Sequence, residues 1–262
     1  MSTGKLKVLV VGATGSIGRL VVAEALRQGH AVRALVRPSH RTHGLPADVE
    51  IFSGELTRPD TLSSLVEGVD AVVFTHGSSG GGREAAEQVD YGAVRNVLQA
   101  LADRPVRVAL MTAIGVTNRE GAYNRSTGIP DWKRRGERLL RASGLPYTIV
   151  RPGWFDYNAR DQHQLVFLQG DTRRAGDPND GVVARQQIAE VLVSSLTSDA
   201  ARGKTFELVA EKGPAQKDLE PLFVALEADH AGALDAVRDT ADMPLNDEPG
   251  TVREDLAQIA RS

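Results

Sequence analysis

Three glycines spaced three residues apart, in G-A-T-G-S-I-G at residues 12–18, follow the short apolar run at residues 5–11. An apolar, β-branched run that ends at a glycine is typical of a buried strand in a parallel sheet. Apolar residues at helical spacing then continue to Gly29, which predicts a helix. Such a strand–turn–helix presents free main-chain N–H groups and the positive end of a helix to one point. The feature restricts the chain to folds that begin with a βαβ unit, and it favours a bound pyrophosphate.

The alternation of strand and helix continues to about residue 210. The pattern predicts strands at 31–36, 49–52, 70–74, 106–111, 147–150 and 204–209, and helices at 60–66, 83–101, 131–142 and 186–196. Right-handed βαβ crossovers build such elements into a doubly wound parallel sheet, so we predict a single Rossmann-like α/β domain. Ligands on such sheets bind at the carboxyl ends of the strands.

The composition of the chain excludes several classes of function. The chain has 262 residues, no cysteine and a net charge of −3. The missing cysteine excludes thiol nucleophiles, zinc–thiolate sites and iron–sulfur clusters, and the charge gives no reason to expect nucleic acid. No apolar run approaches a membrane span, and the start of the chain lacks a signal-peptide pattern. We therefore expect a cytoplasmic monomer or homodimer that acts on a small molecule, without a membrane.

Two further patterns are weak evidence for a functional site. His40 and His43 have the spacing of a metal pair but no third ligand nearby, so no metal site is predicted. Arg134, Arg138 and Arg141 lie on one stripe of a predicted helix. Such a stripe is more typical of a solvated face than of a nucleic-acid reader.

The end of the chain differs from the rest. Residues 211–262 hold twelve acidic and five basic residues, a net charge of −7. Apolar residues at helical spacing near 219–226 and 252–259 predict short amphipathic helices packed on the body. We divide the chain into a cofactor-binding part (1–210), with a substrate loop or lid at 154–185, and an acidic helical extension (211–262). The extension is either a docked appendage or a cover of the substrate pocket.

Several segments together resemble the short-chain dehydrogenase/reductase family. They are G-A-T-G-S-I-G at 12–18, V-R-A-L-V-R at 32–37, G-E-L at 54–56, V-D-Y-G-A at 89–93, W-K-R-R-G-E at 132–137 and S-G-L-P-Y-T-I-V-R-P-G at 143–153. The chain is most similar to the atypical, NmrA-like NAD(P)H-binding branch, over residues 5 to about 210. The resemblance implies a Rossmann-like fold and a nicotinamide dinucleotide cofactor.

The residue after the second strand indicates which dinucleotide. An NAD site usually places a carboxylate there, to accept hydrogen bonds from the ribose hydroxyls. Here the strand ends in Arg37, which can bind a 2′-phosphate, with Arg33, Ser39 and Arg41 as possible helpers. We therefore predict NADP(H) in preference to NAD(H).

Other cofactor contacts follow from the turn and from the resemblance. The resemblance puts Glu55 and Leu56 beside the adenine, and Pro152 and Gly153 by the nicotinamide. The predicted cofactor-binding residues are Gly12, Thr14, Gly15, Ser16, Ile17, Gly18, Arg37, Glu55, Leu56, Thr75, His76, Gly77, Lys133, Pro152 and Gly153. His76 is equally consistent with an ordinary loop histidine.

The catalytic pattern of the family is incomplete. Its reductases use Tyr-x-x-x-Lys on one helical face, where the lysine lowers the tyrosine pKa and the tyrosine donates the proton. Lys133 matches the lysine and Thr112 falls near the serine position, but Ile129 stands where the tyrosine is expected. Three interpretations stay open. Another residue donates the proton (Tyr157, then Tyr123, then His76), or water or the substrate does, or the protein only senses NADP(H).

The substrate is constrained only loosely. Trp154, Phe155 and Phe167 are predicted to wall an apolar pocket, since a long connection after a strand is usually a binding loop. The sequence thus predicts an NADPH-dependent reductase of a carbonyl or quinone-like compound, such as a polycyclic ketone. The alternative is an NADP(H)-sensing regulatory protein, and an epimerase or dehydratase ranks third.

Overall fold

The first βαβ unit forms around the glycine turn. In the computed structural model, which describes residues 4–38, 44–78 and 80–261, β1 (Lys7–Val11) leads into α1 (Ser16–Arg27) and then β2 (Ala31–Val36). β1 pairs in parallel with β2 on one edge and with β4 (Ala71–Phe74) on the other. Val8 to Val11 are fully buried, as expected of an inner strand.

Within the described residues, eight strands form one sheet in the order β3-β2-β1-β4-β5-β6-β10-β8. The remaining members are β3 (Glu50–Ser53), β5 (Arg107–Met111), β6 (Tyr147–Pro152), β8 (Gln164–Leu168) and β10 (Lys204–Glu211). Neighbours are parallel except β8, which runs antiparallel to β10. The chain runs outward from β1 in both directions, so the switch point of the sheet lies between β1 and β4. This confirms the predicted Rossmann-like, doubly wound sheet.

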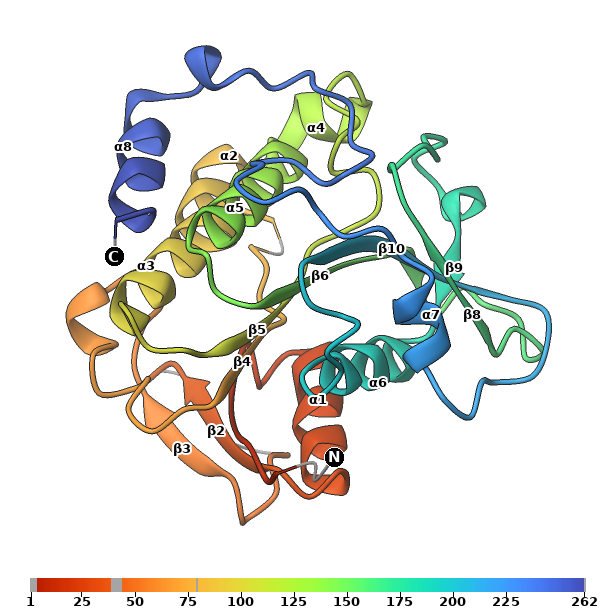
Figure 1. Ribbon diagram of the computed structural model, residues 1–262, viewed down its shortest axis with the longest axis horizontal. Coiled ribbons are helices and arrows are strands. Elements are labelled where there is room, and N and C mark those ends of the chain that lie inside the picture. The colour runs from red at the N-terminus through yellow and green to blue at the C-terminus, as the bar shows by residue number, and fades with distance from the viewer. Residues whose placement is uncertain (1–3, 39–43, 79, 262) are drawn as a thin grey trace.

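Helices cover both faces of the sheet (Figure 1). Successive residues of a strand point to opposite faces. Val8 and Val10 of β1 pack in one apolar cluster with α1 and α6 (Arg185–Ser195). Leu9 and Val11 pack in a second cluster with α3 (Gly92–Leu101) and α5 (Ile129–Ala142). The core is therefore two apolar layers, one on each side of the sheet.

Two predicted helices differ in the structure. The segment 60–66 forms only a single 3₁₀ turn, η1 (Pro59–Thr61), followed by turns. The carbonyl groups of Ser64, Leu65 and Glu67 accept hydrogen bonds from the Arg33 guanidinium.

The predicted helix at 83–101 is divided in three. A short α2 (Gly82–Ala85) passes into a π-helical stretch, η2 (Ala86–Tyr91), before α3 begins. Such π-helical stretches are common at functional sites.

The predicted lid at 154–185 is largely built into the fold. β7 (Trp154–Phe155) pairs with β9 (Val182–Val183), and η3 (Pro178–Asp180) precedes β9. β8 is the apolar insertion of that segment, and it extends the main sheet beyond β10. Leu165 is buried there, and Val166, Phe167 and Leu168 are half-buried beside β10.

The acidic extension runs along both faces of the body. Phe223, in α7 (Glu220–Val224), packs in the cluster of α1 and α6. Val252, Leu256 and Ile259, in α8 (Gly250–Ile259), pack in the cluster of α3 and α5. Between the two helices the chain is mostly irregular, with one 3₁₀ turn, η4 (Leu245–Asp247), and it crosses over α5 (Figure 1). A search of the described residues for a helix able to cross a membrane finds none.

Candidate cofactor and active site

The glycine turn can be made only without side chains. Gly12 has a φ of +89°, and a Cβ there would lie 2.9 Å from the main-chain nitrogen of His76. A Cβ on Gly18 would lie 2.0 Å from the carbonyl oxygen of Gly12. The N–H of Gly15 donates to that same oxygen at 2.9 Å and closes the turn. The close packing of β1, β4 and α1 thus depends on both glycines.

The first turn of α1 faces outward from this cradle. Gly15 is the N-cap residue, and no described side chain caps the helix. Gly15 and Ser16 are exposed and Thr14 is half-buried, whereas Ile17 belongs to the core. Main-chain N–H groups at a helix start bind phosphate with the help of the helix dipole. The residues present fit a dinucleotide pyrophosphate.

The carboxyl end of β4 closes the cradle. Thr75 donates from both its N–H and its hydroxyl to the carbonyl oxygen of Val11, at 2.9 and 3.1 Å. His76 is buried and Gly77 is exposed. The Thr75 side chain therefore fixes the end of β4 to the end of β1, and Gly77 leaves backbone open beside it.

The expected adenosine side lies past β2 and β3. Arg37 is exposed at the end of β2, while Ser39 and Arg41 lie outside the described residues. Glu55 and Leu56 follow β3, and the carbonyl of Leu56 accepts a hydrogen bond from the Asn96 amide at 2.6 Å. Asn96 thus holds the loop that the resemblance places by the adenine.

Arg33 does not assist a phosphate as suggested by the sequence. The Arg33 side chain is buried. It donates hydrogen bonds to the carbonyl groups after η1 and forms an ion pair with Glu50 at 2.8 Å. Its guanidinium stabilises the turns of the fold.

Lys133, on the second turn of α5, pairs with Asp90. The Nζ atom lies 2.7 Å from an Asp90 carboxylate oxygen, and the other oxygen accepts from the Ser78 hydroxyl at 2.5 Å. Asp90 is buried in the π-helical η2. Sequence reasoning missed Asp90, although an acid inside the otherwise apolar face of V-D-Y-G-A was a usable signal.

His76 lies against the same pair. Its Nδ1 atom is buried and has no partner among the described residues. Burial and then the Lys133 charge lower the pKa of His76 to about 4. The imidazole is therefore neutral at neutral pH, and its free nitrogen can accept a hydrogen bond but cannot serve as a charged acid.

The structure separates the two tyrosines considered as proton donors. Tyr123, on α4 (Ala122–Thr127), has an exposed ring. Burial and then the negative charge of Asp90 raise the pKa of Tyr123. Tyr157 packs edge-on against Trp154, with ring centres 6.2 Å apart, and is 65% exposed. Ile129 begins α5 and is buried.

Thr112 follows β5 and is also buried. Its hydroxyl donates to a carboxylate oxygen of Glu137 at 2.7 Å. Both Glu137 oxygens accept from Arg151, at 3.0 and 2.7 Å. Burial opposes this charged arrangement, but Glu137 and Asp239 raise the pKa of Arg151 well above its usual value. Glu137 and Arg151 are thus a charged pair, and Thr112 is already engaged with it.

Two of the three predicted pocket walls, Phe155 and Phe167, pack against the apolar cluster of α1 and α6. Trp154 is partly exposed, and Phe155 lies under the Arg185 guanidinium at 5.4 Å. Phe167 stacks on Phe206, with ring centres 4.2 Å apart. It also lines a cavity of about 690 Å³ together with Ile114, which stands two residues past Thr112.

Pro152 and Gly153 lie at the end of β6. The Pro152 carbonyl accepts from the N–H of Ile114 at 3.0 Å. A Cβ on Gly153 would lie 2.4 Å from the carbonyl oxygen of Gly181. Glycine is needed there for the approach of the β9 segment, whatever its relation to a nicotinamide.

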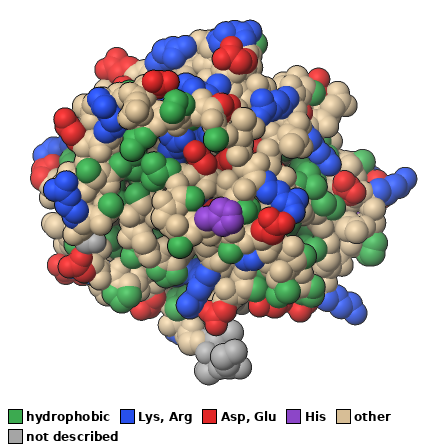
Figure 2. All heavy atoms as spheres, turned by 45° about the horizontal axis from the view of Figure 1, so that its top comes forward, with side chains coloured by type: hydrophobic (Ala, Val, Ile, Leu, Met, Phe, Trp, Pro, Cys, Tyr) green, Lys and Arg blue, Asp and Glu red, His purple; other side chains and the backbone are tan. Residues whose placement is uncertain are grey.

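The arginine stripe on α5 is not a solvated face, so that prediction was wrong. Arg134, Arg138 and Arg141 are buried under the acidic extension. Arg138 pairs with Asp235 at 2.6 Å, and Arg141 pairs with Asp229 at 3.1 Å. On the face of the molecule in Figure 2, acidic and basic side chains are interspersed and form no continuous basic stripe. A carboxylate-rich segment far along the chain neutralises the stripe.

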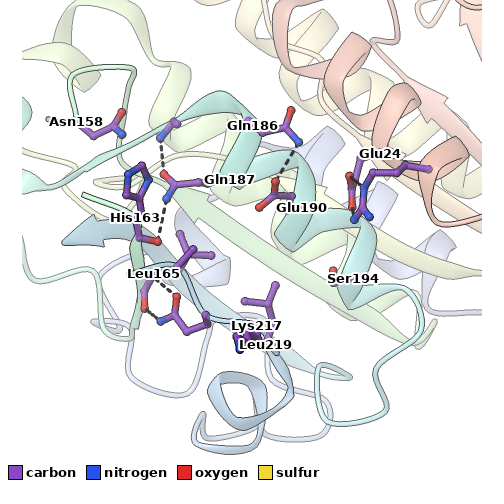
Figure 3. Close-up of a pocket in the computed structure, with 14 residues that line it drawn as sticks. Glu24, Asn158, His163, Leu165, Gln186, Gln187, Glu190, Ser194, Lys217 and Leu219 are labelled. Carbon is purple, nitrogen blue, oxygen red and sulfur yellow. Dashed lines mark hydrogen bonds and ion pairs between the residues drawn. The ribbon is translucent and has the colours of Figure 1, made fainter. Parts of the chain in front are cut away.

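A second cavity, of about 540 Å³, lies along α6 and reaches Glu24 and Arg27 of α1 (Figure 3). Its amide and charged side chains are largely paired with each other. Gln187 bridges the Ala184 N–H and the His163 carbonyl, and Gln186 donates to Glu190. Within the described ranges no cluster of three metal-ligating side chains occurs.

Fold and cradle together define a dinucleotide-binding protein of the Rossmann class. Residues 12–199 match the model of the NAD(P)H-binding family, and the chain belongs to that family. Its homologues lie in the atypical, NmrA-like branch of the short-chain dehydrogenases/reductases, which confirms the resemblance noted in the sequence.

Three relatives illustrate the range. The chain is 28% identical over 265 residues to sanguinarine reductase of Eschscholzia californica, covering 85% of this chain and 96% of that protein. A solved structure from Bacillus halodurans, assigned as an NAD-dependent epimerase/dehydratase, is 25% identical with a TM-score of 0.66, covering 80% and 96%. A short-chain dehydrogenase/reductase from Veillonella parvula in complex with NADP has a TM-score of 0.61 at 16% identity, covering 81% and 100%. The last likeness concerns the fold alone.

Proposed function

We propose that the chain is an NADPH-dependent reductase of a carbonyl or quinone-like small molecule. The observation that carries the proposal is the ion pair of half-buried Lys133 with buried Asp90 beside exposed Gly77, at the edge where the glycine turn opens. A Cβ built on Gly77 would lie 3.9 Å from the Lys133 Nζ. The bound cofactor would supply the hydride. Lys133 would hold the cofactor ribose, and Asp90 fixes the lysine in place.

NADPH is preferred over NADH in this proposal because of Arg37. The side chain stands at the end of β2, one strand away from the glycine turn, and no carboxylate occupies the position that reads an unmodified ribose. A guanidinium there pairs with a 2′-phosphate through charge-assisted hydrogen bonds.

Calorimetry on Arg37→Ala tests the preference. The affinity for NADPH should fall about 10- to 100-fold, the amount expected for a lost charged hydrogen bond, while the affinity for NADH should barely change. Arg58→Ala is the matched control, since Arg58 is exposed beyond β3 and pairs with Asp60. Equal losses for both cofactors would defeat the assignment.

The proton for the reduced substrate would come from Tyr123. Tyr123 lies on α4, the helix directly before α5, and α5 carries Lys133. Tyr157 packs against Trp154 instead. The two tyrosines are both exposed, so a Tyr→Phe change at either one leaves the core intact.

NADPH oxidation measured with a panel of quinones and polycyclic ketones tests the role of Tyr123. Tyr123→Phe should lower turnover about 100-fold if the hydroxyl is the acid, and Tyr157→Phe should leave it near wild type. The reverse result would transfer the role to Tyr157. Full activity of both variants would point to water or the substrate itself.

A second candidate, an NADP(H) sensor without catalysis, is favoured by one observation: buried Ile129 in place of the family's tyrosine. The same panel separates the two functions. Tight NADPH binding without oxidation by any acceptor would favour the sensor. Turnover of even one acceptor would favour the reductase.

A further inference from the structure

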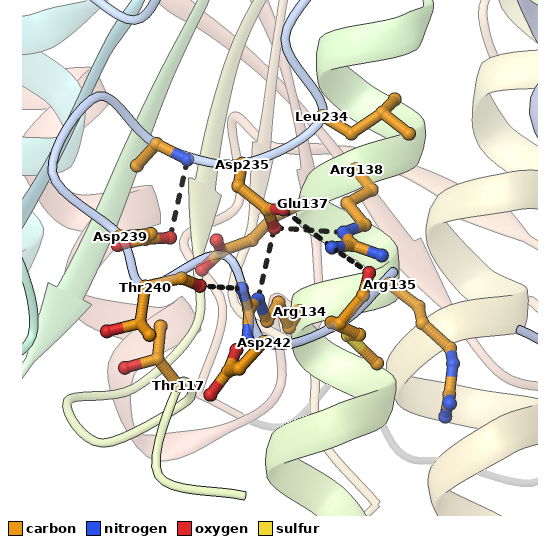
Figure 4. A network of polar contacts seen from close by, with 12 residues as sticks. Thr117, Arg134, Arg135, Glu137, Arg138, Leu234, Asp235, Asp239, Thr240 and Asp242 are labelled. Atoms are coloured by element: carbon orange, nitrogen blue, oxygen red, sulfur yellow. Dashed lines mark hydrogen bonds and ion pairs between the residues drawn. The ribbon is translucent and has the colours of Figure 1, made fainter. Parts of the chain in front are cut away.

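The irregular segment at residues 229–248, here called the acidic strap, crosses α5 and binds its arginines (Figure 4). Asp235 lies between Arg134 and Arg138 and accepts from both, at 3.1 and 2.6 Å. Asp242 accepts from Arg134 at 2.5 Å. These contacts fix the strap on the outer side of α5.

One strap carboxylate reaches further inward. The two oxygens of Asp239 accept from the two terminal nitrogens of Arg151, both at 2.7 Å. Arg151 in turn donates to both oxygens of Glu137, and Glu137 accepts the Thr112 hydroxyl at 2.7 Å. The side chains of Asp239, Arg151 and Glu137 have no exposed area. A continuous buried chain of charged contacts therefore joins the strap to the carboxyl end of β5.

This chain sets the direction of the Thr112 hydrogen bond. Glu137 faces Arg151 and Arg141, so it is a carboxylate, which can only accept hydrogen bonds. Thr112 has one hydroxyl proton and spends it on Glu137. Toward a ligand, Thr112 therefore offers lone pairs only.

We propose that Asp239 is a positioning residue of the reductase site: through Arg151 and Glu137 it holds Thr112 as a hydrogen-bond acceptor for the nicotinamide end of the cofactor. The inference rests on the proposed function, because it needs a nicotinamide dinucleotide in the cradle. The group matched to Thr112 is a hydrogen-bond donor, such as the amino group of a carboxamide, and not a substrate carbonyl. The strap, which lies beyond the residues matched by the family model, thus completes the site of this chain.

A purely structural strap would behave differently from a positioning one. Asp239 and Asp242 both belong to the strap and both pair with buried arginines. Arg134, the partner of Asp242, instead donates to Asp235, Asp242 and the Thr240 carbonyl. Loss of either carboxylate should lower the melting temperature. Only loss of Asp239 should change how the nicotinamide half is held.

The experiment is calorimetry with NADP⁺ and with 2′,5′-ADP, which lacks the nicotinamide half, on wild type, Asp239→Asn and Asp242→Asn. Asp239→Asn should weaken NADP⁺ about 10-fold, the scale of one hydrogen bond, and leave 2′,5′-ADP unchanged. Asp242→Asn should leave the ratio of the two affinities at the wild-type value. An unchanged ratio in Asp239→Asn would overturn the proposal.

Thr112→Val keeps the test decisive if Asp239→Asn fails to fold. Valine has the shape of threonine but no acceptor, so it should cause the same selective loss of NADP⁺ affinity. In the double variant the two losses should not add, because they act through one contact. Wild-type NADP⁺ affinity in Thr112→Val would contradict the inference. If wild type binds neither ligand, the proposed function itself fails, which is a different outcome.

Discussion

The glycine turn and the arginine face of α5 are built by opposite means. The turn uses main-chain atoms of residues 12–18 and the neighbouring end of β4, and it buries no charged side chain. The α5 face buries arginines against carboxylates 88 to 113 positions away in sequence. The first region depends on the absence of side chains, and the second on having both partners of every pair.

The difference teaches where each region is vulnerable. A backbone cradle fails when an atom is added, because rigid main chain cannot move aside. A buried ion pair fails when an atom or charge is removed, because the remaining charge stays desolvated without a partner. Neither kind of damage is expected at an exposed pair, where water replaces the lost partner.

The largest expected effect is that of Gly18→Ala. The added Cβ would meet the oxygen and carbon of Gly12 at 2.0 and 2.7 Å, so α1 must shift away from β1. We expect a loss of about 3 kcal/mol or more in the free energy of unfolding and loss of measurable NADP⁺ binding. Denaturant unfolding and calorimetry provide the measurements.

Gly250→Ala is the matched control, since nothing lies within 4 Å of a Cβ at that helix start. It should be neutral or slightly stabilising. Wild-type NADP⁺ affinity in Gly18→Ala would break the contrast, because the turn could then accept a side chain.

The same contrast explains what the sequence allowed us to predict. The buried strands, the first helix and the cradle follow from patterns close along the chain: apolar periodicity and a glycine at each tight approach. The fold and family predictions were confirmed for that reason. The prediction for Arg33 was wrong. A short sequence motif does not show whether a strand residue lies at an exposed strand end or in a buried strand interior.

The buried ion pairs between α5 and the acidic extension could not be predicted in this way. The residues at 134, 138 and 141 show a helical stripe, but their partners belong to an acidic segment whose path across α5 leaves no local pattern. The path of L-V-F-L at 165–168 could not be predicted for a related reason: it completes the sheet only because β10, some forty residues later, offers its edge. Asp90 escaped notice because its partner Lys133 approaches from another helix.

The next largest effect is expected from Glu248→Ala. The carboxylate is buried and pairs with Arg135 and Arg138, at 2.6 and 3.0 Å. Removing it leaves Arg138 with Asp235 alone and Arg135 with no carboxylate partner among the described residues, at a cost of about 3 kcal/mol. Thermal unfolding measures the cost, and hydrogen exchange should show the strap opening before the sheet. A loss below about 1 kcal/mol would mean that water already reaches these pairs.

A smaller effect, dependent on pH, is expected at Glu207. Burial, opposed by Arg151 and reinforced by Asp171, raises the pKa of Glu207 to about 7. The unfolded chain releases this proton near pH 4.5, so between these values the native state binds more protons and its stability falls as the pH rises.

Between pH 5 and pH 8 this one group should lower the free energy of unfolding by about 2 kcal/mol. The glutamine in Glu207→Gln cannot ionise, so its free energy of unfolding should lack this dependence on pH. The difference in the free energy of unfolding between variant and wild type should therefore grow toward alkaline pH. Urea unfolding at several pH values measures it. Parallel pH curves for the two proteins would show that Glu207 is ionised throughout.

The smallest effect is expected at the exposed pair of Arg58 and Asp60, which are 60% and 65% accessible at the side chain. Their distance of 2.8 Å is as short as those of the buried pairs. Asp60→Asn should nevertheless change the free energy of unfolding by less than about 0.5 kcal/mol, because water screens the charges in both states. If this variant cost as much as Glu248→Ala in the same unfolding assay, charge alone would decide stability. The distinction between a buried and an exposed ion pair, on which the role of the strap depends, would then be lost.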